Sequence, residues 1–536
     1  MTTKTYNVAL KEGVDYNAFW IEIETNGSGS TYVPQRGVDI VNERSTSLRQ
    51  CWYALTEIEA EKLRNDTRVY CVEIPPEHRD DIEIAPNAVQ TGLYYKSPGT
   101  NPANNLGINW GLFRLNSRTN NTPGASGTLN YNYSLDGTGV DFVLTDSGCQ
   151  IDHPEFTDSN GVTRVQQINW YTASGVSGTM PNFATFYTDY DGHGTHCTGI
   201  AAGKTYGRAK NSRIYVLSVA GLTVSPTTGI PPTECFDVIK GWHNNKPIDP
   251  ELGYKRPTVV NMSWSYINAF SSITGGNYRG TNWTGSFRRT DYGMIGGSGN
   301  RFGVRVDSLD VDVAELLAAG VVLVGAAGNY YQTIDVPGGL DYNNYYTNSS
   351  GSNTYYMRGG SPGCSNGVIC VGNISTASDS PEEKSAESES GPRVDVWAPG
   401  TNIVSAASNN NLYGATTTYP NNSSFKIMSI SGTSMASPNV AGMVAQLLQL
   451  YPGYTPEQIR ALVVANSTSG MLYTTGLTTD YSNTRSLHGG RNRYAYLNPN
   501  ALPESQRPTS GTVYPRLTNG TRPAVGLLYP RPRIRN

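Results

Sequence analysis

Short runs of apolar residues, each nearly continuous, recur through the middle of the chain. They lie at 140–144, 214–217, 259–262 and 321–324. Strands covered on both faces show this pattern, because neither side of the strand meets water. Segments of helical character lie between and after them, most clearly 311–319 and 441–451. The alternation predicts an α/β fold with a mainly parallel sheet, from about residue 108 to 480.

A polar stretch interrupts this region at about 266–305. It is rich in Gly, Tyr, Asn and Thr and contains no long apolar run. Long segments of this kind inside a compact domain lie at the surface. We therefore predict a surface insertion in the main domain.

Residues 1–80 form a separate unit by their pattern. Strand-like segments at 6–10, 51–55 and 68–73 alternate with a possible helix at 15–24 and a second helix that starts at Thr56. Thr is a favoured N-cap, and acidic residues follow in the first turn. The pattern predicts a small α+β domain. Residues 81–107, with Pro, Asn and Gly throughout, read as an exposed linker.

The last segment, 481–536, changes character again. From Arg491 onward it holds eight arginines, no lysine and one acidic residue, and a Tyr-Pro-Arg repeat recurs at 514–516 and 529–531. Proline-rich extended segments form no core. We expect an extended tail that is solvated or docks onto an assembly. Phosphate binding by its arginines is the weaker alternative.

Composition removes several classes of function. The formal net charge of −3 leaves no global footprint for nucleic acid, and no apolar run approaches the roughly 18 residues that span a bilayer. The first residues lack the apolar core of a signal peptide. We therefore expect neither a nucleic-acid partner nor a membrane span. Seven scattered cysteines are an odd number, which favours free, packed thiols over disulfides.

Four residues sit in local settings that suit acyl transfer by a serine. Asp146 follows an apolar strand, His193 lies in a glycine-rich segment, and Ser434 directly precedes a helix. Asn329 ends a strand and a small-residue turn that includes Gly328. A serine nucleophile needs an imidazole base, a carboxylate that orients the base, and donors for the oxyanion. The sequence offers one candidate for each role.

At these segments the chain resembles the subtilase family of serine endopeptidases, over about residues 108–475. The motifs are Asp191-Gly192-His193, Gly432-Thr433-Ser434 and the strand before Asp146, in the family's order Asp, His, Ser. Within the family, His196-Cys197 resembles the proteinase K branch. The resemblance implies the three-layer subtilisin-like fold and peptide hydrolysis through an acyl-enzyme, with no cofactor needed for catalysis.

The resemblance also assigns further roles. Residues 1–80 resemble the family's inhibitory propeptide, which implies a zymogen whose own N-terminal domain blocks the cleft until the linker is cut. A protein or peptide substrate would add as a strand at Ser263-Trp264-Ser265, with Gly328 opposite. Ser-Trp-Ser replaces the family's usual Ser-Leu-Gly, so we expect an indole near the primary specificity pocket and a departure from preference for large apolar residues.

A structural calcium ion is a further implication. The resemblance offers the carboxylate of Asp395, with backbone carbonyls near Asn366 and Val368, and oxygen ligands are what calcium takes. Glu155 is either another calcium ligand or a surface carboxylate. Cys197, close to His193 in sequence, is expected to pack as a small apolar residue, and a reactive thiol is the alternative.

Two other functions stay open. A structural or assembly component could retain this fold, with the N-terminal domain and the tail as docking elements. The missing signal peptide and the repeated tail motif suggest a protein carried in an assembly, a virus particle being one example. A serine esterase fits less well, because Ser434 lacks the Gly-x-Ser-x-Gly elbow.

Overall fold

The computed structural model describes most of the chain. The described residues are 2–25, 38–43, 47–79, 81, 83–86, 90–91, 109–120, 131, 133–222, 228–285, 291–294, 300–375, 382–420, 422–472 and 485–498.

A mainly parallel sheet forms the centre of the main domain. Its strand order is β23-β24-β19-β18-β15-β10-β7-β9-β8, and every neighbouring pair is parallel except β23 with β24. The bounds are β7 Asp141–Asp146, β8 Val165–Gln166, β9 Arg213–Ser218, β10 Thr258–Met262, β15 Val322–Ala326, β18 Ile369–Ile374, β19 Val396–Pro399, β23 Thr468–Ser469 and β24 Arg493–Tyr494. The four apolar runs of the sequence fall in β7, β9, β10 and β15, where the side chains are almost all buried.

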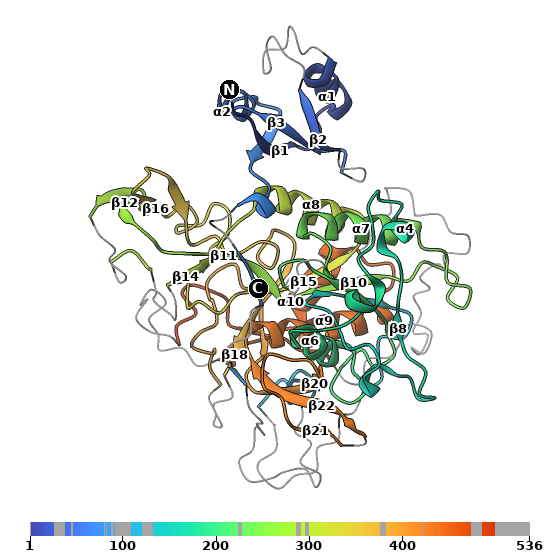
Figure 1. The fold of residues 1–536 in the computed structure, drawn as a ribbon. Helices are drawn as coiled ribbons and strands as arrows, with labels where there is room; N and C mark the ends of the chain where they lie inside the picture. The colour runs from blue at the N-terminus through green and yellow to red at the C-terminus, as the bar shows by residue number, and fades with distance from the viewer. Residues whose placement is uncertain are drawn as a thin grey trace, which may run out of the picture.

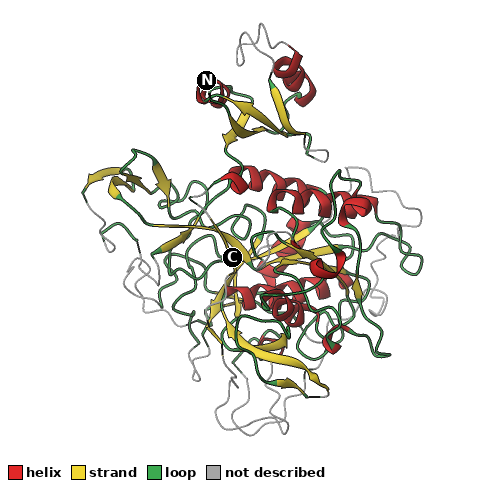
Figure 2. Cartoon of the chain, viewed as in Figure 1, coloured by secondary structure: helices red, strands yellow, loops and turns green. Residues whose placement is uncertain are grey.

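Helices cover both faces of this sheet, which gives three layers (Figure 1, Figure 2). On one face lie α6 (His193–Ala202) and α9 (Thr433–Leu450), and on the other α7 (Pro232–Asn245) and α8 (Asp307–Ala318). The α/β prediction is therefore confirmed. Shorter or peripheral helices are α3 Gly111–Arg114, η2 Pro154–Phe156, α4 Trp170–Ser174, α5 Phe183–Phe186 and α10 Pro456–Asn466.

Helix α9 is longer than its apolar pattern predicts. The pattern indicates 441–451, whereas the helix begins at Thr433 and contains Pro438 in its second turn. Pro438 has no N–H to donate to the Ser434 carbonyl oxygen four residues earlier, and that oxygen accepts the Ser263 hydroxyl at 2.9 Å instead. Gly432, with φ of 148°, precedes the first turn, so the chain turns sharply from β22 (Asn422–Ser431) into the helix. This places Ser434 in the first turn.

The N-terminal domain is a four-stranded antiparallel sheet with two helices. The order is β2-β3-β1-β4, with β1 Lys4–Leu10, β2 Asp39–Glu43, β3 Gln50–Leu55, β4 Val69–Glu73, α1 Tyr16–Thr25 and α2 Glu57–Arg64. Thr56 caps α2 in a reciprocal capping box with Glu59. Strand β2 is absent from the sequence prediction, because its segment lacks a run of apolar residues.

This domain rests on α8 and α7 of the main domain (Figure 1). The Gln50 side-chain amide donates to Asp312 Oδ1 at 2.6 Å, and the Ser308 backbone N–H donates to Glu73 Oε1 at 2.6 Å. The Thr233 hydroxyl donates to Glu77 Oε1 at the start of α7. Glu73 and Glu77 thus place carboxyl groups at two helix N-termini, where the first backbone N–H groups have no partner within the helix.

The linker prediction is wrong for two short segments. Strand β5 (Glu83–Pro86) pairs antiparallel with β11 (Trp264–Ala269), and β6 (Gln90–Thr91) pairs antiparallel with β22. The other strands of the β22 sheet are β20 Ile403–Ala407 and β21 Thr418–Tyr419. A short 3₁₀ helix, η1, spans Pro76–His78 before β5. Polar and proline-rich composition hid these strands, because the main chain rather than apolar side chains supplies the pairing.

The insertion is partly a small sheet of its own. Residues 266–305 contribute the end of β11, β12 Ile273–Tyr278, β13 Thr281–Thr284 and β14 Arg301–Gly303. A second segment that the sequence prediction missed, β16 Tyr345–Asn348 and β17 Asn353–Tyr355, completes a four-stranded sheet with β12 and β13. Aromatic residues, including Phe270, Phe302 and Tyr346, form its core.

The predicted start of the C-terminal extension at 481 is also wrong. Residues 485–498 belong to the main domain: β24 joins the central sheet, and the ring of Tyr494 is fully buried against the Arg114 guanidinium. The tail with the Tyr-Pro-Arg repeat lies outside the described residues. Over the part of the chain that is described, no helix is both long and apolar enough to cross a bilayer.

Candidate active site

Asp146 and His193 meet at the carboxyl end of the central sheet. Asp146 is the last residue of β7, and His193 is the first residue of α6. Their side chains are fully buried, and Nδ1 of His193 lies 2.7 Å from Oδ1 of Asp146. The same oxygen accepts the backbone N–H of Ser147 at 2.7 Å. A carboxylate in this position fixes the imidazole orientation and its tautomer.

A glycine allows α6 to approach β7 this closely. A Cβ on Gly194 would lie 2.1 Å from the carbonyl oxygen of Gly148, in the turn that follows Asp146. Any side chain would therefore push the helix, and His193 with it, away from Asp146. The glycine-rich motif around His193 thus has a steric cause.

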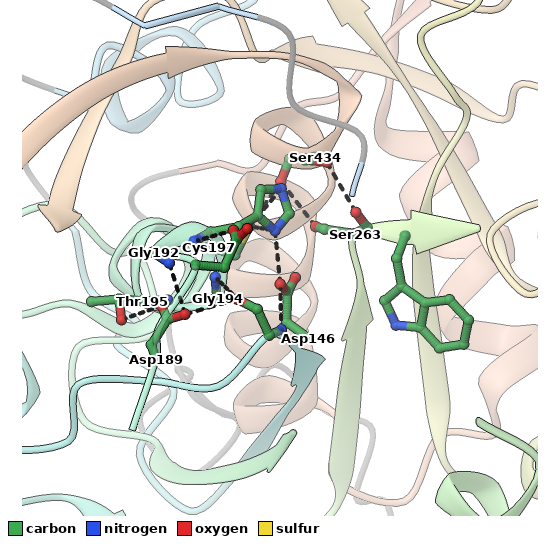
Figure 3. Close-up of polar contacts among 12 residues, drawn as sticks. Asp146, Asp189, Gly192, Gly194, Thr195, Cys197, Ser263 and Ser434 are labelled. Atoms are coloured by element: carbon green, nitrogen blue, oxygen red, sulfur yellow. Dashed lines mark hydrogen bonds and ion pairs between the residues drawn. The ribbon is translucent and has the colours of Figure 1, made fainter. Parts of the chain in front are cut away.

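Asp189 organises the same region, and the sequence analysis missed it. This buried carboxylate accepts hydrogen bonds from the Ser147 hydroxyl (2.9 Å), the Gly192 backbone N–H (2.8 Å), and the backbone and hydroxyl of Thr195 (2.8 and 2.6 Å) (Figure 3). It ties the turn after Asp146 to the first turn of α6. An acidic residue two positions before Asp191-Gly192-His193 is the only sequence signal.

Ser434 lies at the amino end of α9, beside β11. Its hydroxyl donates to the carbonyl oxygen of Ser263 at 3.0 Å, and the Ser263 hydroxyl donates back to the Ser434 carbonyl at 2.9 Å (Figure 3). The Cys197 thiol on α6 contacts the same Ser434 carbonyl at 3.4 Å and lies 3.9 Å from Nε2 of His193. Cys197 therefore packs α6 against α9 between the imidazole and the serine.

Asn329 faces the same turn from the other side. Its Oδ1 accepts the backbone N–H of Thr433 at 2.9 Å and the Thr433 hydroxyl at 3.0 Å. These bonds fix the orientation of the amide, so that Nδ2 is directed away from Thr433. The Thr433 hydroxyl also accepts the N–H of Gly328 at 3.2 Å. The turn after β15 and the start of α9 are thus held together.

Charge around His193 changes its protonation. Burial is the largest single effect and would lower the pKa of the imidazole, but the Asp146 carboxylate, Cys197 and Tyr413 together outweigh burial, and the pKa stands well above its ordinary value. The site therefore stabilises an imidazolium. That is the charge which a general base acquires when it accepts a proton.

The strand edge at Trp264 and Ser265, where the sequence predicts substrate binding, differs from the prediction in two ways. The chain itself occupies it, because Pro86 of β5 pairs with Trp264 and Ala85 pairs with Ser265. The Trp264 indole is fully buried and donates to Thr145 Oγ1 at 3.2 Å. The indole therefore belongs to the core. The expectation that it lies near the primary specificity pocket is wrong.

None of the seven cysteines, all of them described, forms a disulfide in the structure, as expected from their odd number and spacing. Six are buried and Cys71 is half-buried. Cys364 and Cys370 come closest, with their sulfur atoms 3.9 Å apart.

The residues around Asp395 do not fit a calcium ion, because the Arg393 guanidinium already binds the proposed ligands. It donates to the carbonyl oxygens of Cys364 (2.9 Å), Ser365 (2.7 Å) and Val368 (2.8 Å), and to Asp395 Oδ2 (3.0 Å). Arg460 binds the same carboxylate at 2.5 Å. A fixed cation thus supplies the positive charge that calcium would bring.

Glu155 is neither a surface carboxylate nor arranged as a metal ligand. It is fully buried, and its Oε2 accepts the backbone N–H groups of Thr205 and Tyr206 at 2.8 and 3.2 Å. Its Oε1 accepts the Tyr419 hydroxyl at 3.0 Å. These donors satisfy the carboxylate without a metal ion.

Replacing Arg393 should convert this region into a calcium-dependent one. Arg393→Ala leaves three carbonyl oxygens and a carboxylate without their buried cation, which costs about 3–5 kcal/mol of stability. Calcium should restore part of the lost melting temperature, since the exposed ligand set is all oxygen. Calorimetry with calcium and with a chelator measures this.

Arg460→Ala is the matched control. It removes the more exposed partner of Asp395 and leaves the guanidinium of Arg393 in place, so calcium should change its melting temperature no more than that of the wild type. A calcium-dependent gain that is equal in wild type and Arg393→Ala would contradict the assignment.

Comparisons with known proteins agree with this geometry. Residues 137–493, more than half of the chain, match the sequence profile of the subtilase family. A subtilisin-like serine protease of Cochliobolus lunatus is 29% identical over 70% of this chain, and one of Penicillium citrinum is 28% identical over 71%. This chain spans only 58% and 65% of the length of those two relatives.

Two further matches cover nearly the whole chain. The subtilisin-like proteinase Spm1 of Pyricularia oryzae is 28% identical over 90% of this chain and 76% of its own length. The crystal structure of fervidolysin from Fervidobacterium pennivorans, described as a keratinolytic enzyme related to subtilisin, superimposes with a TM-score of 0.50 at 19% identity, over 92% of this chain and 60% of that one. The latter likeness supports the fold alone. From its motifs, its three-layer fold and the profile match together, we conclude that the chain belongs to the subtilase family.

Proposed function

We propose that this protein is a serine endopeptidase made as a zymogen, with Asp146, His193 and Ser434 as its catalytic triad and Asn329 as an oxyanion donor. The observation that carries the proposal is the buried 2.7 Å pair of His193 and Asp146, which lies beside the helix turn that bears Ser434. Because Nδ1 of this imidazole is bonded to Asp146, the imidazole can accept a proton from the serine only at its other nitrogen, Nε2. The Cys197 sulfur lies 3.8 and 3.9 Å from the two ring nitrogens of His193 and 3.4 Å from the Ser434 carbonyl oxygen, so the imidazole is close to the turn that bears Ser434.

The reaction follows from this arrangement. The Ser434 hydroxyl, which donates to the Ser263 carbonyl in the resting chain, turns to His193 Nε2 and attacks the substrate carbonyl carbon as it gives up its proton. The imidazolium is stabilised by Asp146 and returns the proton to the leaving amine. The Asn329 side-chain amide and the backbone N–H of Ser434 stabilise the oxyanion. Water then hydrolyses the acyl-enzyme by the same route. No cofactor takes part.

The N-terminal domain and its connection serve as the intramolecular inhibitor. Strand β5 lies on the β11 edge, which a substrate strand would need, and β6 pairs with Ile430 and Ser431, just before Ser434. Pro86 thus lies opposite Trp264 and Gln90 opposite Ser431, and both partners are close to Ser434 along the chain or through Ser263. Residues 87–89 lie outside the described residues. We expect the first cut between Pro86 and Gln90.

The test is incubation of purified protein with a fluorophosphonate probe, followed by intact-mass analysis and peptide mapping. We expect the label on Ser434 alone and an N-terminal fragment that ends between Pro86 and Gln90. A fragment that ends well outside this interval would refute the strand-based placement of the cut. Absence of label, even after the N-terminal domain has been removed by limited proteolysis, would refute the triad.

Docking of the N-terminal domain should weaken as pH rises. Burial, with the Asp307 charge adding, raises the pKa of Glu73 to about 7 at the interface with α8. The docked state thus holds a proton that the free carboxyl loses near pH 4.5. Stabilisation present below about 4.5 is therefore lost as pH rises to about 7, and we expect docking to weaken roughly tenfold or more.

Hydrogen exchange of uncleaved Ser434→Ala protein measures this effect. Protection at the start of α8 should fall between pH 5 and pH 8 more than it does in Ser434→Ala with Glu73→Gln, compared at each pH. Glu77→Gln, at the start of α7, is the matched control. Equal pH dependence with and without Glu73 would exclude this carboxyl as the source.

An assembly role remains compatible with a protease. The proposal that residues 505–536 dock the protein onto a particle rests on the sequence alone, because this tail lies outside the described residues. Deleting 505–536 should release the protein from its assembly, as sedimentation would show. Unchanged association with every particle would reject the proposal.

A further inference from the structure

A buried acid without a hydrogen-bonded partner lies beside the proposed active site. Glu389 is fully buried, and neither of its carboxyl oxygens has a hydrogen-bond partner among the described residues. Leaving a buried carboxyl without a hydrogen-bond partner costs free energy, and ionisable groups of this kind are concentrated at functional sites. Neither the triad nor the docking of the N-terminal domain uses this residue.

The position of Glu389 relative to Ser434 is fixed by two segments. The backbone N–H of Glu389 donates to the Gly328 carbonyl at 2.9 Å, so the residue runs alongside the turn that carries Asn329. A methyl group placed on Gly328 would lie 2.6 Å from Cδ of Glu389 and 2.8 and 2.9 Å from its two oxygens. Only the absence of a side chain at Gly328 lets the carboxyl reach this place.

The opposite wall belongs to the substrate edge. The Gly303 amide is close enough to favour the charged form of Glu389, and Gly303 pairs with Ile267 of β11. Glu389 therefore lies between the Gly328 turn and the sheet of β11 and β14. The start of α9 is flanked by the same two walls, because Ser434 bonds Ser263, the residue before β11, and Thr433 bonds Asn329, the residue after Gly328.

We infer that Glu389 closes the deep end of the primary specificity pocket and, in substrates that come from other chains, selects a lysine or arginine side chain at the residue whose carbonyl Ser434 attacks. The first cut between Pro86 and Gln90, an interval without lysine or arginine, is directed instead by the pairing of β5 and β6 with the main domain. The inference rests on the proposed function and names its substrate class. A cationic side chain that enters between the two walls would supply the missing donors to both carboxyl oxygens. A leucine or phenylalanine side chain would leave the carboxyl buried and unpaired.

The charge state of the Glu389 carboxyl agrees with this role. Burial, with the neighbouring Cys364 thiol adding, raises the pKa of Glu389 well above its ordinary value, and the Gly303 amide offsets this only in part. The carboxyl is therefore held neutral until a cation arrives. Glu389→Gln copies the neutral form in shape, so this variant should fold.

The test uses matured wild type and Glu389→Gln, each first titrated with a fluorophosphonate so that rates refer to active enzyme. A set of fluorogenic peptides that differ only at the residue before the cut is then compared. We expect the wild type to prefer Lys or Arg over Leu and Phe by at least tenfold in kcat/KM, and Glu389→Gln to lose at least tenfold of that ratio.

Glu387→Gln, two residues earlier in the same segment and only half-buried, is the matched control and should keep the wild-type ratio. Preference for Leu or Phe in the wild type, or a ratio unchanged in Glu389→Gln, would overturn the inference and leave the triad intact. Failure of the wild type to take up the fluorophosphonate would instead refute the proposed function.

Discussion

Ser434→Ala should lower kcat on an unstructured protein substrate by about six orders of magnitude, as loss of the catalytic serine does in subtilisin. The substitution removes the only atom that could form the acyl-enzyme and leaves the oxyanion donors in place. The residual rate over water should therefore still be measurable, at roughly 10³-fold. Rates are best followed with a quenched fluorescent protein substrate after removal of the N-terminal domain by limited proteolysis.

The same variant should remain a single uncut chain. Since the first cut is proposed to be the protein's own reaction, Ser434→Ala protein should keep the mass of the full chain under conditions in which the wild type separates into two fragments. Ser437→Ala is the matched control, because Ser437 lies one turn further along α9 and bonds Asn261 at 2.8 Å instead of facing the cleft. Rapid cleavage of substrate by Ser434→Ala would eliminate this residue as the nucleophile.

Asp146→Asn should lower kcat by about 10⁴-fold at neutral pH. The amide keeps the shape of the side chain, but it can present its N–H₂ group to Nδ1 of His193 and so favour the wrong tautomer. It also loses the charge that stabilises the imidazolium. Because Asp146 contacts His193 at 2.7 Å, we expect this substitution to lower activity more than any other except that of the serine.

The pH profile separates Asp146→Asn from a merely misfolded variant. In the wild type the raised pKa of His193 keeps the base protonated to higher pH, so kcat/KM should rise with pH until the imidazole is neutral. Without the Asp146 charge, burial dominates and lowers the pKa, so the acid limb of the profile should move to lower pH. Asp158→Asn, at an exposed turn, should change neither rate nor profile. An acid limb that stays at the wild-type pH would mean that Asp146 does not act on His193.

The sequence by itself determined the fold class and the candidate triad. Strands buried on both faces need continuous apolar runs, so β7, β9, β10 and β15 were readable from composition over a few residues. The site needs a glycine next to His193 and a helix that begins beside Ser434. Both requirements fall on neighbouring residues, so they appear in the sequence as short motifs. Asp146, His193, Ser434 and Asn329 could therefore be named, and the structure brings them to one edge of the sheet.

Only the tertiary structure decided what surrounds those residues. Pairing of β5 with β11 depends on main-chain hydrogen bonds, which leave no side-chain pattern. Arg393 donates to carbonyl oxygens of residues 364–368 because folding brings these segments together. No local motif therefore predicts that a guanidinium binds the oxygens expected to bind calcium. The same holds for Trp264, which faces the core, and for Glu389, whose position against Gly328 depends on contacts between segments 61 positions apart. The direction of a side chain and the pairing of charges far apart in the chain depend on how distant segments pack together. A short stretch of sequence therefore cannot predict them.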